Sequence, residues 1–289
     1  MTLKAKDVVK KIKTLAPLPD VCIKINQLAD DPRASTHDIK RVIETDPALA
    51  ARLLRIANSP FYGFSSKVDD LNRAVMLIGT QGLRDLVWGM SSITTFSKMN
   101  IKQVDMKAFW EHAVYTATVS KVLAKKCHVM NPDRLFLSGL LHDIGHLVLF
   151  QLMPDEMEVA FVSSQETGEK LILAEKNVLG FTHPSVSYAL LKMWNLPESI
   201  CHAVAYHHQP GKCEGHRLDA AIVHIADNIA KMAGKSGNSL KSQERIDANA
   251  WKITGLNEKI IDSVIRISDE QYKDAISIYL AAIKVAPAA

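Results

Sequence analysis

Seven histidine and aspartate residues stand at positions from which they could bind a metal ion. In chain order they are His112, His142, Asp143, His183, His207, His208 and Asp227. Neutral imidazoles and carboxylates suit first-row ions such as iron, manganese and zinc. Each residue alone has an ordinary structural explanation, either a hydrogen-bonded core histidine, an ion-paired aspartate or a helix cap. Together they favour a shared divalent metal site, with one ion or two.

The most informative pair, His142 and Asp143, lies inside a very apolar segment that is predicted to be one helix over 132–152. Gly139 and Gly145 flank the pair and allow close approach of a neighbouring backbone. A buried ionised carboxylate costs several kcal/mol unless it is paired or bound to a cation. Neighbouring helical residues point about 100° apart and satisfy each other poorly. Both side chains can, however, reach a cation between helices.

The other candidates occupy helix faces or helix ends. His112 falls on the apolar stripe of a predicted helix over 105–127, and Asp227 falls on a similar stripe in a later helix. Thr182 or His183 is expected to cap the helix that follows, and two adjacent histidines end the helix before residue 209. Five further histidines are expected to be surface or ordinary helix residues: His37, His128, His202, His216 and His224.

The elements that must position these residues are predicted to be helices throughout. Apolar residues recur at helical spacing, and alternating runs typical of strands are absent. The sequence therefore predicts an all-α protein with helices over 36–44, 47–57, 69–78, 81–97, 105–127, 132–152, 154–167, 169–178, 184–194, 197–208, 217–234, 243–253, 256–265 and 268–284. The segment 233–242 is predicted to be a flexible loop.

The composition is that of a globular protein. The 289 residues are 47% hydrophobic and 23% charged, which excludes wholesale disorder. The net charge of +4 comes without a basic stripe, and we expect no nucleic-acid partner. Lys121, Lys125 and Lys126 are expected on a solvated helix face.

No membrane-spanning or secretory segment is expected. The most apolar stretch, 135–153, is interrupted by His142, Asp143 and His146, and residues 1–13 lack the apolar run of a signal peptide. The four cysteines form no C-x-x-C pair, and we expect free thiols in a reducing compartment. These features predict a cytoplasmic protein without a membrane partner.

The order of the seven residues resembles the HD superfamily of metal-dependent phosphohydrolases, and more closely the HDOD proteins (HD-related output domain). The N-terminal half carries further blocks that look like the HDOD pattern: Leu-Pro at 18–19, Asp-Pro-Ala-Leu at 46–49, the run at 53–63, and AVMLIG at 74–79. The resemblance covers roughly residues 14–232. It implies a multi-helix HD-type bundle with an N-terminal helical subdomain. The implied division is 1–100, 101–234 and a C-terminal helical extension at 235–289.

In the related HD-GYP proteins, which degrade cyclic di-GMP, the corresponding residues bind two metals. By that resemblance His112, His142, Asp143 and Asp227 would hold one ion, and His183, His207 and His208 the other, with Asp143 bridging them. Asp143 and His146 would then be the catalytic candidates.

Two departures separate this chain from the HD-GYP pattern. The lysine that follows the His-Asp histidine by four residues is His146 here, and histidine carries no permanent positive charge near neutral pH. His207-His208 is followed by Gln-Pro-Gly-Lys at 209–212, and Gly-Tyr-Pro is absent, which argues against cyclic di-GMP hydrolysis.

The HDOD resemblance implies a bacterial signal-transduction protein whose metal site serves an output or ligand-sensing module. Its partners would be signalling proteins or a small nucleotide ligand, and an oligomer is compatible with the sequence. The alternative is an active metal-dependent phosphohydrolase acting on a nucleotide or cyclic nucleotide. Metal content and turnover discriminate the two hypotheses.

Overall fold

A computed structural model describes residues 5, 7–8, 19–60, 62–97, 99, 101–237 and 245–284. Over these residues the chain is helical and contains no strand, which confirms the all-α prediction. The α-helices are α2 (Asp20–Asp30), α3 (Thr36–Glu44), α4 (Pro47–Ala57), α5 (Leu71–Phe96), α6 (Met106–Lys126), α7 (Asp133–Leu141), α8 (Ile144–Leu152), α9 (Pro154–Thr167), α10 (Leu171–Leu179), α11 (His183–Met193), α12 (Glu198–Ala205), α13 (Arg217–Met232), α14 (Ala248–Thr254) and α15 (Ile261–Lys284). Two short 3₁₀ turns, η1 (Pro210–Lys212) and η2 (Glu258–Ile260), complete the order.

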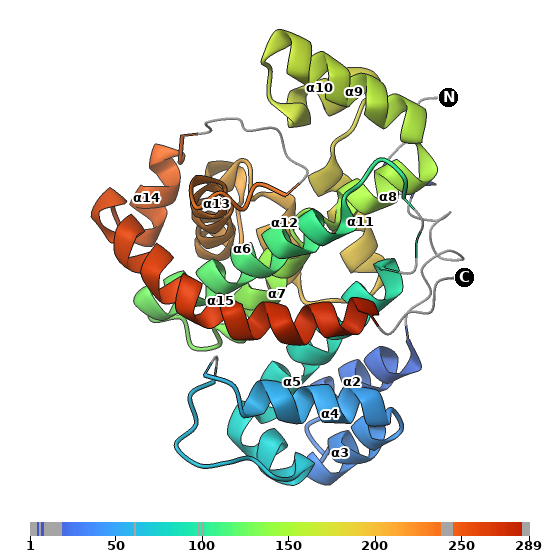
Figure 1. Cartoon of the computed structure of the whole chain (residues 1–289), viewed down its shortest axis with the longest axis vertical. Coiled ribbons are helices and arrows are strands. Elements are labelled where there is room, and N and C mark those ends of the chain that lie inside the picture. Colours follow the sequence, from blue (N-terminus) through green and yellow to red (C-terminus); the bar gives the residue numbers. More distant parts are fainter. Residues whose placement is uncertain are drawn as a thin grey trace.

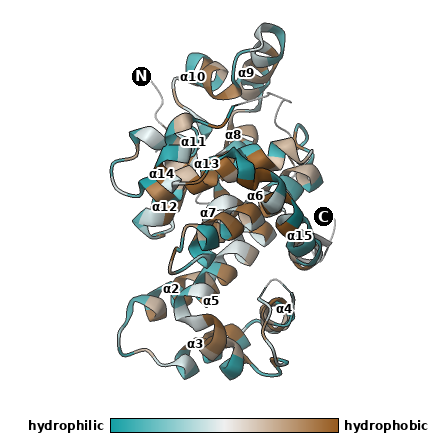
Figure 2. Cartoon of the chain, turned by 90° about the vertical axis from the view of Figure 1, so that its left-hand side faces the viewer, coloured by the Kyte–Doolittle hydropathy of each residue, from teal (hydrophilic) through white to brown (hydrophobic). Residues whose placement is uncertain are grey.

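The helices form a small N-terminal lobe below a larger bundle (Figure 1). In the lobe, α2, α3 and α4 pack on α5. In the bundle, α6 is central and packs against α7, α13 and α15. The α9–α10 hairpin projects from the end of the bundle opposite the lobe. Figure 2 shows apolar residues on the faces of α6 and α13 that meet inside the bundle. The proposed boundaries at residues 100 and 234 stay predictions.

Local signals explain where the N-terminal helices begin. Ser35 and Asp38 form a capping box at the start of α3, each accepting a hydrogen bond from the other's backbone N–H. The Asp46 side chain accepts from the N–H of Leu49 at 2.9 Å, and Pro47 opens α4 with a φ suited to a first helical turn. The bounds predicted for α3, α4 and α9 match the structure.

One predicted break is confirmed: the helices predicted over 69–78 and 81–97 are the two segments of α5, which meet at a kink at Gly79 with φ 79°. Elsewhere the helix predictions differ from the structure. The single helix predicted over 132–152 breaks at the His-Asp pair into α7 and α8. The two helices predicted after residue 256 are one long α15 preceded by η2, and α2 was not predicted. Tertiary packing overrides local periodicity in these cases.

Lys121 contradicts the expected solvated face of α6. Its side chain is buried, its Nζ lies 2.8 Å from Asp133 Oδ1, and it sits 4.1 Å from the centroid of the Tyr62 ring. Lys125, by contrast, is exposed as expected. The reason is that α7 packs along α6 and supplies a carboxylate, which spacing within α6 alone does not reveal.

One stretch, Asp133–Leu152, is long and apolar enough to cross a membrane by length and composition, yet 78% of it is buried inside the protein. It comprises α7 and α8, and this burial is that of a core segment. The four cysteines are free thiols, as predicted.

Candidate metal centre

The seven candidate ligands converge from five parts of the bundle. His112 comes from α6, the His142-Asp143 pair from the break between α7 and α8, His183 from the first turn of α11, the His207-His208 pair from the turn after α12, and Asp227 from the middle of α13. All are buried except His208, which is half-buried. The structure brings all seven together, while their role as ligands stays a prediction.

Three of these residues form a first group on one side of Asp143. His112 Nε2 lies 3.3 Å from His142 Nε2 and 3.2 Å from Asp227 Oδ1. His142 Nε2 lies 3.7 Å from the same oxygen. Three ligand atoms therefore face one another at spacings that suit a shared cation.

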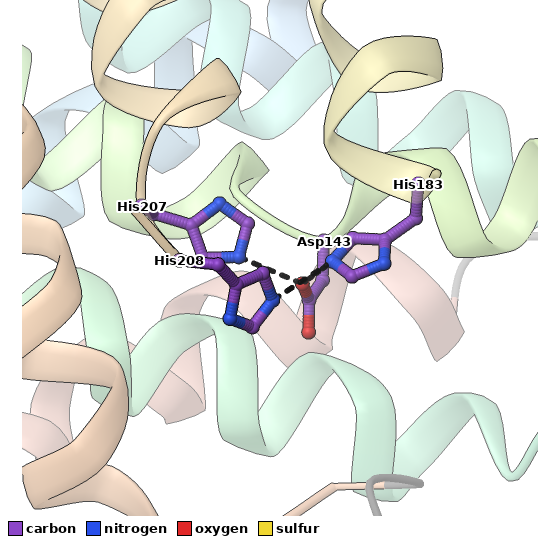
Figure 3. Close-up of side chains that lie close together, drawn as sticks. All are labelled: Asp143, His183, His207 and His208. Carbon is purple, nitrogen blue, oxygen red and sulfur yellow. Dashed lines mark hydrogen bonds and ion pairs between the residues drawn. The ribbon is translucent and has the colours of Figure 1, made fainter. Parts of the chain in front are cut away.

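The second group lies on the other side and includes Asp143 itself (Figure 3). Asp143 Oδ1 is 3.3 Å from His183 Nε2 and 3.6 Å from His207 Nε2. His208 Nε2 lies 3.2 Å from His183 Nε2. The rings of His183, His207 and His208 converge on the carboxylate from α11 and the end of α12.

Asp143 joins the two groups because its two oxygens point to different sides. Oδ1 faces His183 and His207, whereas Oδ2 lies 3.3 Å from His142 Nε2 and 3.9 Å from His112 Nε2. The break between α7 and α8 makes this possible, since Asp143 leaves helical geometry at φ −102° and ψ 10°. A carboxylate in this position can bridge two cations.

The outer nitrogens of four histidines are held by acceptors. Nδ1 bonds a backbone carbonyl in three of them, and a carboxylate in the fourth; the pairs are His112 with Lys235 O, His142 with Gly139 O, His207 with Val204 O, and His183 with Glu175. In the neutral form of each ring Nδ1 carries the proton, and Nε2 then presents a lone pair to the centre. Metal-binding histidines are oriented in this way.

Two buried atoms in the cluster have no hydrogen-bond partner among the described residues. They are His207 Nε2 and Asp227 Oδ1, one from each group. Buried polar atoms are costly when unsatisfied, and a cation would satisfy both. The donor set and these orphaned atoms fit a divalent metal.

Burial and neighbouring charges shift the pKa values of the second group. Burial lowers the pKa of His207 to about 4, and burial with the adjacent His207 lowers the pKa of His208 well below its usual value. Burial opposes ionisation of Asp143, but His142 and His146 outweigh it and hold its pKa well below the ordinary range. His207 and His208 are therefore neutral beside an ionised Asp143. Burial also opposes the charged form of His183, but Glu175 and Asp143 outweigh it and raise the pKa of His183 to about 9, so a metal must displace a proton there.

In the first group, a lysine side chain competes with a metal cation for the carboxylate of Asp227. Lys231, one turn after Asp227 on α13, places its Nζ 2.8 Å from Asp227 Oδ2. Burial would lower the pKa of His142, but Asp143 and Asp227 outweigh it and raise that pKa to about 10. In the absence of a cation, a proton on His142 balances the carboxylates, and a metal must displace that proton.

Glu175, on α10, was not identified from the sequence. It is fully buried; its Oε1 lies 2.8 Å from His146 Nε2, and its Oε2 accepts from the backbone N–H of His183 at 2.8 Å. With its contact to His183 Nδ1, this carboxylate orients one candidate ligand and engages His146. The only sequence signal for Glu175 was the presence of an acidic residue within an apolar helix. Its partner, His183, lies eight residues later in the sequence.

His224 was expected to be a surface or ordinary helix residue, and the structure corrects this. It is buried, its Nδ1 bonds the backbone carbonyl of His207 at 2.7 Å, and its Nε2 accepts from the N–H of Asp247 at 2.9 Å. The side chain therefore holds the turn that carries two candidate ligands.

The space beside the cluster is narrow. A cavity of about 20 Å³ is bordered by His112, Asp143 and His146 and by apolar residues that include Phe109 and Phe161. This volume holds a water molecule and falls far below the few hundred Å³ of a typical small-molecule site.

The chain matches the HDOD domain over residues 15–210, which is more than half of its length. The Geobacter sulfurreducens HDOD domain protein of unknown function superposes with a TM-score of 0.75 at 21% identity, over 98% of this chain and 99% of that chain. A Marinobacter aquaeolei structure, described as a candidate signal transduction protein, gives a TM-score of 0.72 at 23% identity over 97% of this chain and 62% of that one.

A candidate phosphohydrolase from Shewanella amazonensis gives a TM-score of 0.70 at 22% identity, over 93% of this chain and 97% of that one. An uncharacterized protein of Treponema pallidum is 24% identical over 206 residues, which are 71% of this chain and only 39% of that relative. The solved structures share the fold, and the domain match assigns the chain: it belongs to the HDOD family.

Proposed function

We propose that this protein is a bacterial signal-transduction protein whose HD-type His/Asp cluster binds divalent metal, in a module that senses a ligand or passes a signal to a partner. The proposed ligands are the seven residues described above, in two groups that share Asp143. The observation that carries the proposal is the pattern of orientation, in which four Nδ1 atoms are bonded outward and the Nε2 atoms face inward.

The surroundings of the cluster favour signalling over turnover. The adjacent cavity of about 20 Å³ leaves no room for a nucleotide. His146, which stands where a phosphohydrolase of this type would use lysine, is bonded to Glu175 at 2.8 Å. A metal bound here would hold Asp143 and the imidazoles in one arrangement, and a change in that arrangement would reach α7, α11, α12 and α13. Free thiols and the absence of a basic stripe are consistent with a cytoplasmic protein that acts on protein or nucleotide partners.

The second candidate function is hydrolysis of a phosphoester on a nucleotide or cyclic nucleotide. The specific observation in its favour is that the two oxygens of Asp143 face two separate groups of ligand atoms, the arrangement required by a two-metal site. The structures of related fold include candidate phosphohydrolases, and one is described as metal-dependent. Asp143 and His146 remain the proposed catalytic residues of this alternative.

Metal analysis followed by a turnover screen tests both candidates. The protein is purified without a His tag, bound iron, manganese and zinc are quantified, and hydrolysis is measured on nucleotides, cyclic nucleotides and simple phosphoesters. We expect stoichiometric metal without turnover. Turnover that requires metal and Asp143 would establish the enzyme instead, and a folded, functional protein without metal would refute the metal centre.

A further inference from the structure

A second cavity lies away from the metal centre, where the N-terminal lobe meets the bundle. Its volume is about 310 Å³, within the range of small-molecule sites. Polar side chains dominate its wall: Gln81, Arg84, Asn131, Arg134 and Ser199. None of the seven candidate metal ligands lines it. This junction cavity therefore has a chemistry of its own.

Arg84 supplies the positive charge of the junction cavity. The residue is only 5% exposed, and its Nε donates to Asp85 Oδ1 at 3.2 Å. Nη1 lies 3.6 Å from Asp30, whose side chain is 66% exposed, and this separation is longer than a hydrogen bond. Within the described residues, neither terminal nitrogen of Arg84 makes a hydrogen bond, although the side chain lines the cavity. A buried guanidinium with free donors favours an oxyanion.

Two helices begin at the same cavity, each directly after a proline. Pro132 precedes α7 and Pro197 precedes α12, and neither proline offers a side-chain acceptor to the first turn. Arg134 and Ser199, in those first turns, line the cavity. At α7 the N–H of Asp133 already donates to Asn131 Oδ1 at 3.2 Å. The positive end of the helix dipole that can attract an anion is therefore the start of α12, where Glu198 of the first turn is paired with Lys192.

The other charged side chains near the cavity are Arg134, Asp85 and Asp30. Arg134 is committed to a two-pronged ion pair with Asp219, at 3.2 and 2.9 Å, and therefore shapes the wall rather than binding an anion directly. Asp85 accepts from Arg84 Nε on Oδ1, whereas its buried Oδ2 has no hydrogen-bond partner among the described residues. Asp30 lies at the exposed rim, where its loose contact can yield to a stronger anion.

We propose that the junction cavity binds a small phosphate-bearing ligand, with Arg84 and the start of α12 holding the phosphate group. The cavity volume limits the ligand to about the size of a mononucleotide. Binding would connect α2 and α5 of the lobe to α7 and α12 of the bundle.

The same helices lead from the junction cavity to the metal centre. Arg134 precedes His142 by eight residues, and Ser199 precedes His207 by eight. At 1.5 Å per residue, each separation is about 12 Å along the helix direction. A ligand that shifts the starts of α7 and α12 would therefore move candidate ligands at their far ends. This coupling, unlike the binding itself, rests on the proposed metal function.

The binding is tested by titrating inorganic phosphate calorimetrically into the purified chain, with chloride holding the ionic strength constant. Gln81→Glu adds one negative charge at the exposed edge of the cavity without changing shape, and Gln165→Glu on α9 is the matched control. We expect one phosphate per chain and a loss of at least about tenfold in affinity for Gln81→Glu, because like charges repel across a short distance. Arg84→Met should weaken binding similarly, and Gln165→Glu should not.

Asp143→Asn identifies phosphate that binds at the metal centre instead. The proposal requires that this variant still binds one phosphate per chain, with an affinity that differs from that of the metal-free wild type by less than about threefold. It is overturned if the wild type binds no phosphate, if Gln81→Glu leaves the affinity unchanged, or if Asp143→Asn abolishes binding.

The coupling is tested by titrating manganese with and without saturating phosphate. We expect the manganese affinity to change by about threefold or more, with the reciprocal change in phosphate affinity that linkage demands. Equal manganese affinities overturn the coupling. A chain that binds phosphate but no metal would contradict the proposed function while leaving the phosphate site intact, which separates the two failures.

Discussion

At the scale of single residues, Asp143 has the central place because each of its oxygens faces a different set of imidazoles. Oδ1 is 3.3 Å from His183 Nε2, and Oδ2 is 3.3 Å from His142 Nε2. Without Oδ1 of Asp143 the second group would contain three imidazoles and no carboxylate, whereas the first group would keep Asp227. The negative charge between the groups is what makes a shared cation centre reasonable.

Replacing Asp143 by alanine should therefore abolish metal binding at both groups. The bridging anion is removed, and the remaining imidazoles lose the charge that offsets cation desolvation. Metal content measured by elemental analysis should fall to background, whereas Asp155→Ala on exposed α9 should retain it. Unchanged metal in the Asp143 variant would contradict the ligand assignment.

Glu175 does not face the metal centre. Its carboxylate bonds the backbone N–H and Nδ1 of His183 and so orients that candidate ligand. Glu175→Gln keeps the shape but loses the charge that fixes the protonation of Nδ1. We expect metal affinity to fall by about 10- to 100-fold, as for other outer carboxylates. Competition titration with a chelating dye measures the change, and Glu166→Gln on α9 is the control. Equal affinities for wild type and Glu175→Gln would limit this residue to a packing role.

At the scale of elements, glycines set the distance between the helices that carry the ligands. A Cβ on Gly145 would lie 2.2 Å from the backbone oxygen of His183 and 2.7 Å from Ser187 Oγ. A Cβ on Gly139 would lie 2.8 Å from the Cα of Ala117. Real Cβ atoms do not approach so closely, and α8 and α11 can reach this packing only with glycine at 145.

Gly145→Ala should therefore push α8 away from α11 and widen the second group of ligands. We expect a loss of about 2 kcal/mol or more in the free energy of unfolding, together with weaker metal binding. Urea denaturation gives the first quantity and metal titration the second. Gly211→Ala is a suitable control because its added Cβ meets nothing closer than 3.4 Å. A Gly145 variant as stable as this control would contradict the tight packing.

At the scale of the whole molecule, one buried ion pair lies on each side of the junction between the lobe and the bundle. Asp85 on α5 pairs with Arg84, while Asp133 on α7 pairs with Lys121 on α6. Burial lowers the pKa of Lys121 to about 8, with Asp133 opposing that shift. Burial raises the pKa of Asp85 to about 6 despite the opposing effect of Arg84. The junction therefore carries ionisation costs that respond to pH.

The free energy of unfolding should depend on pH because ionised Asp85 is buried. The pKa of Asp85 is about 6 in the folded state, against 3.8 for an ordinary aspartate, and the folded state holds more protons between these two pH values. Stability contributed by this group is complete below about pH 4 and is lost as the pH rises to about 6, by about 2–3 kcal/mol. Asp85→Asn cannot ionise and should gain that amount relative to wild type across this window.

Urea unfolding of wild type and Asp85→Asn at several pH values measures the difference. Other carboxylates titrate in both proteins and cancel in the comparison. A stability difference that stays constant from pH 4 to 6 would show that Asp85 ionises normally in the folded protein.

The sequence alone was sufficient for the helical class, several helix bounds, the HDOD family and the seven residues that converge. The family came from the resemblance of short sequence blocks. The helices and the seven residues depend on local signals: caps such as Asp46-Pro47, apolar stripes, and polar residues such as Asp227 that stand on a stripe without a packing reason. Such signals need only a few neighbouring residues, and helix geometry makes them readable.

Tertiary structure decided everything that depends on distant residues meeting. The two-sided position of Asp143, the support from Glu175 and His224, and the burial of Lys121 arise where separate helices pack. So does the junction cavity around Arg84. The physical reason is that the cost of a buried charge depends on its partners, and those partners come from other parts of the chain.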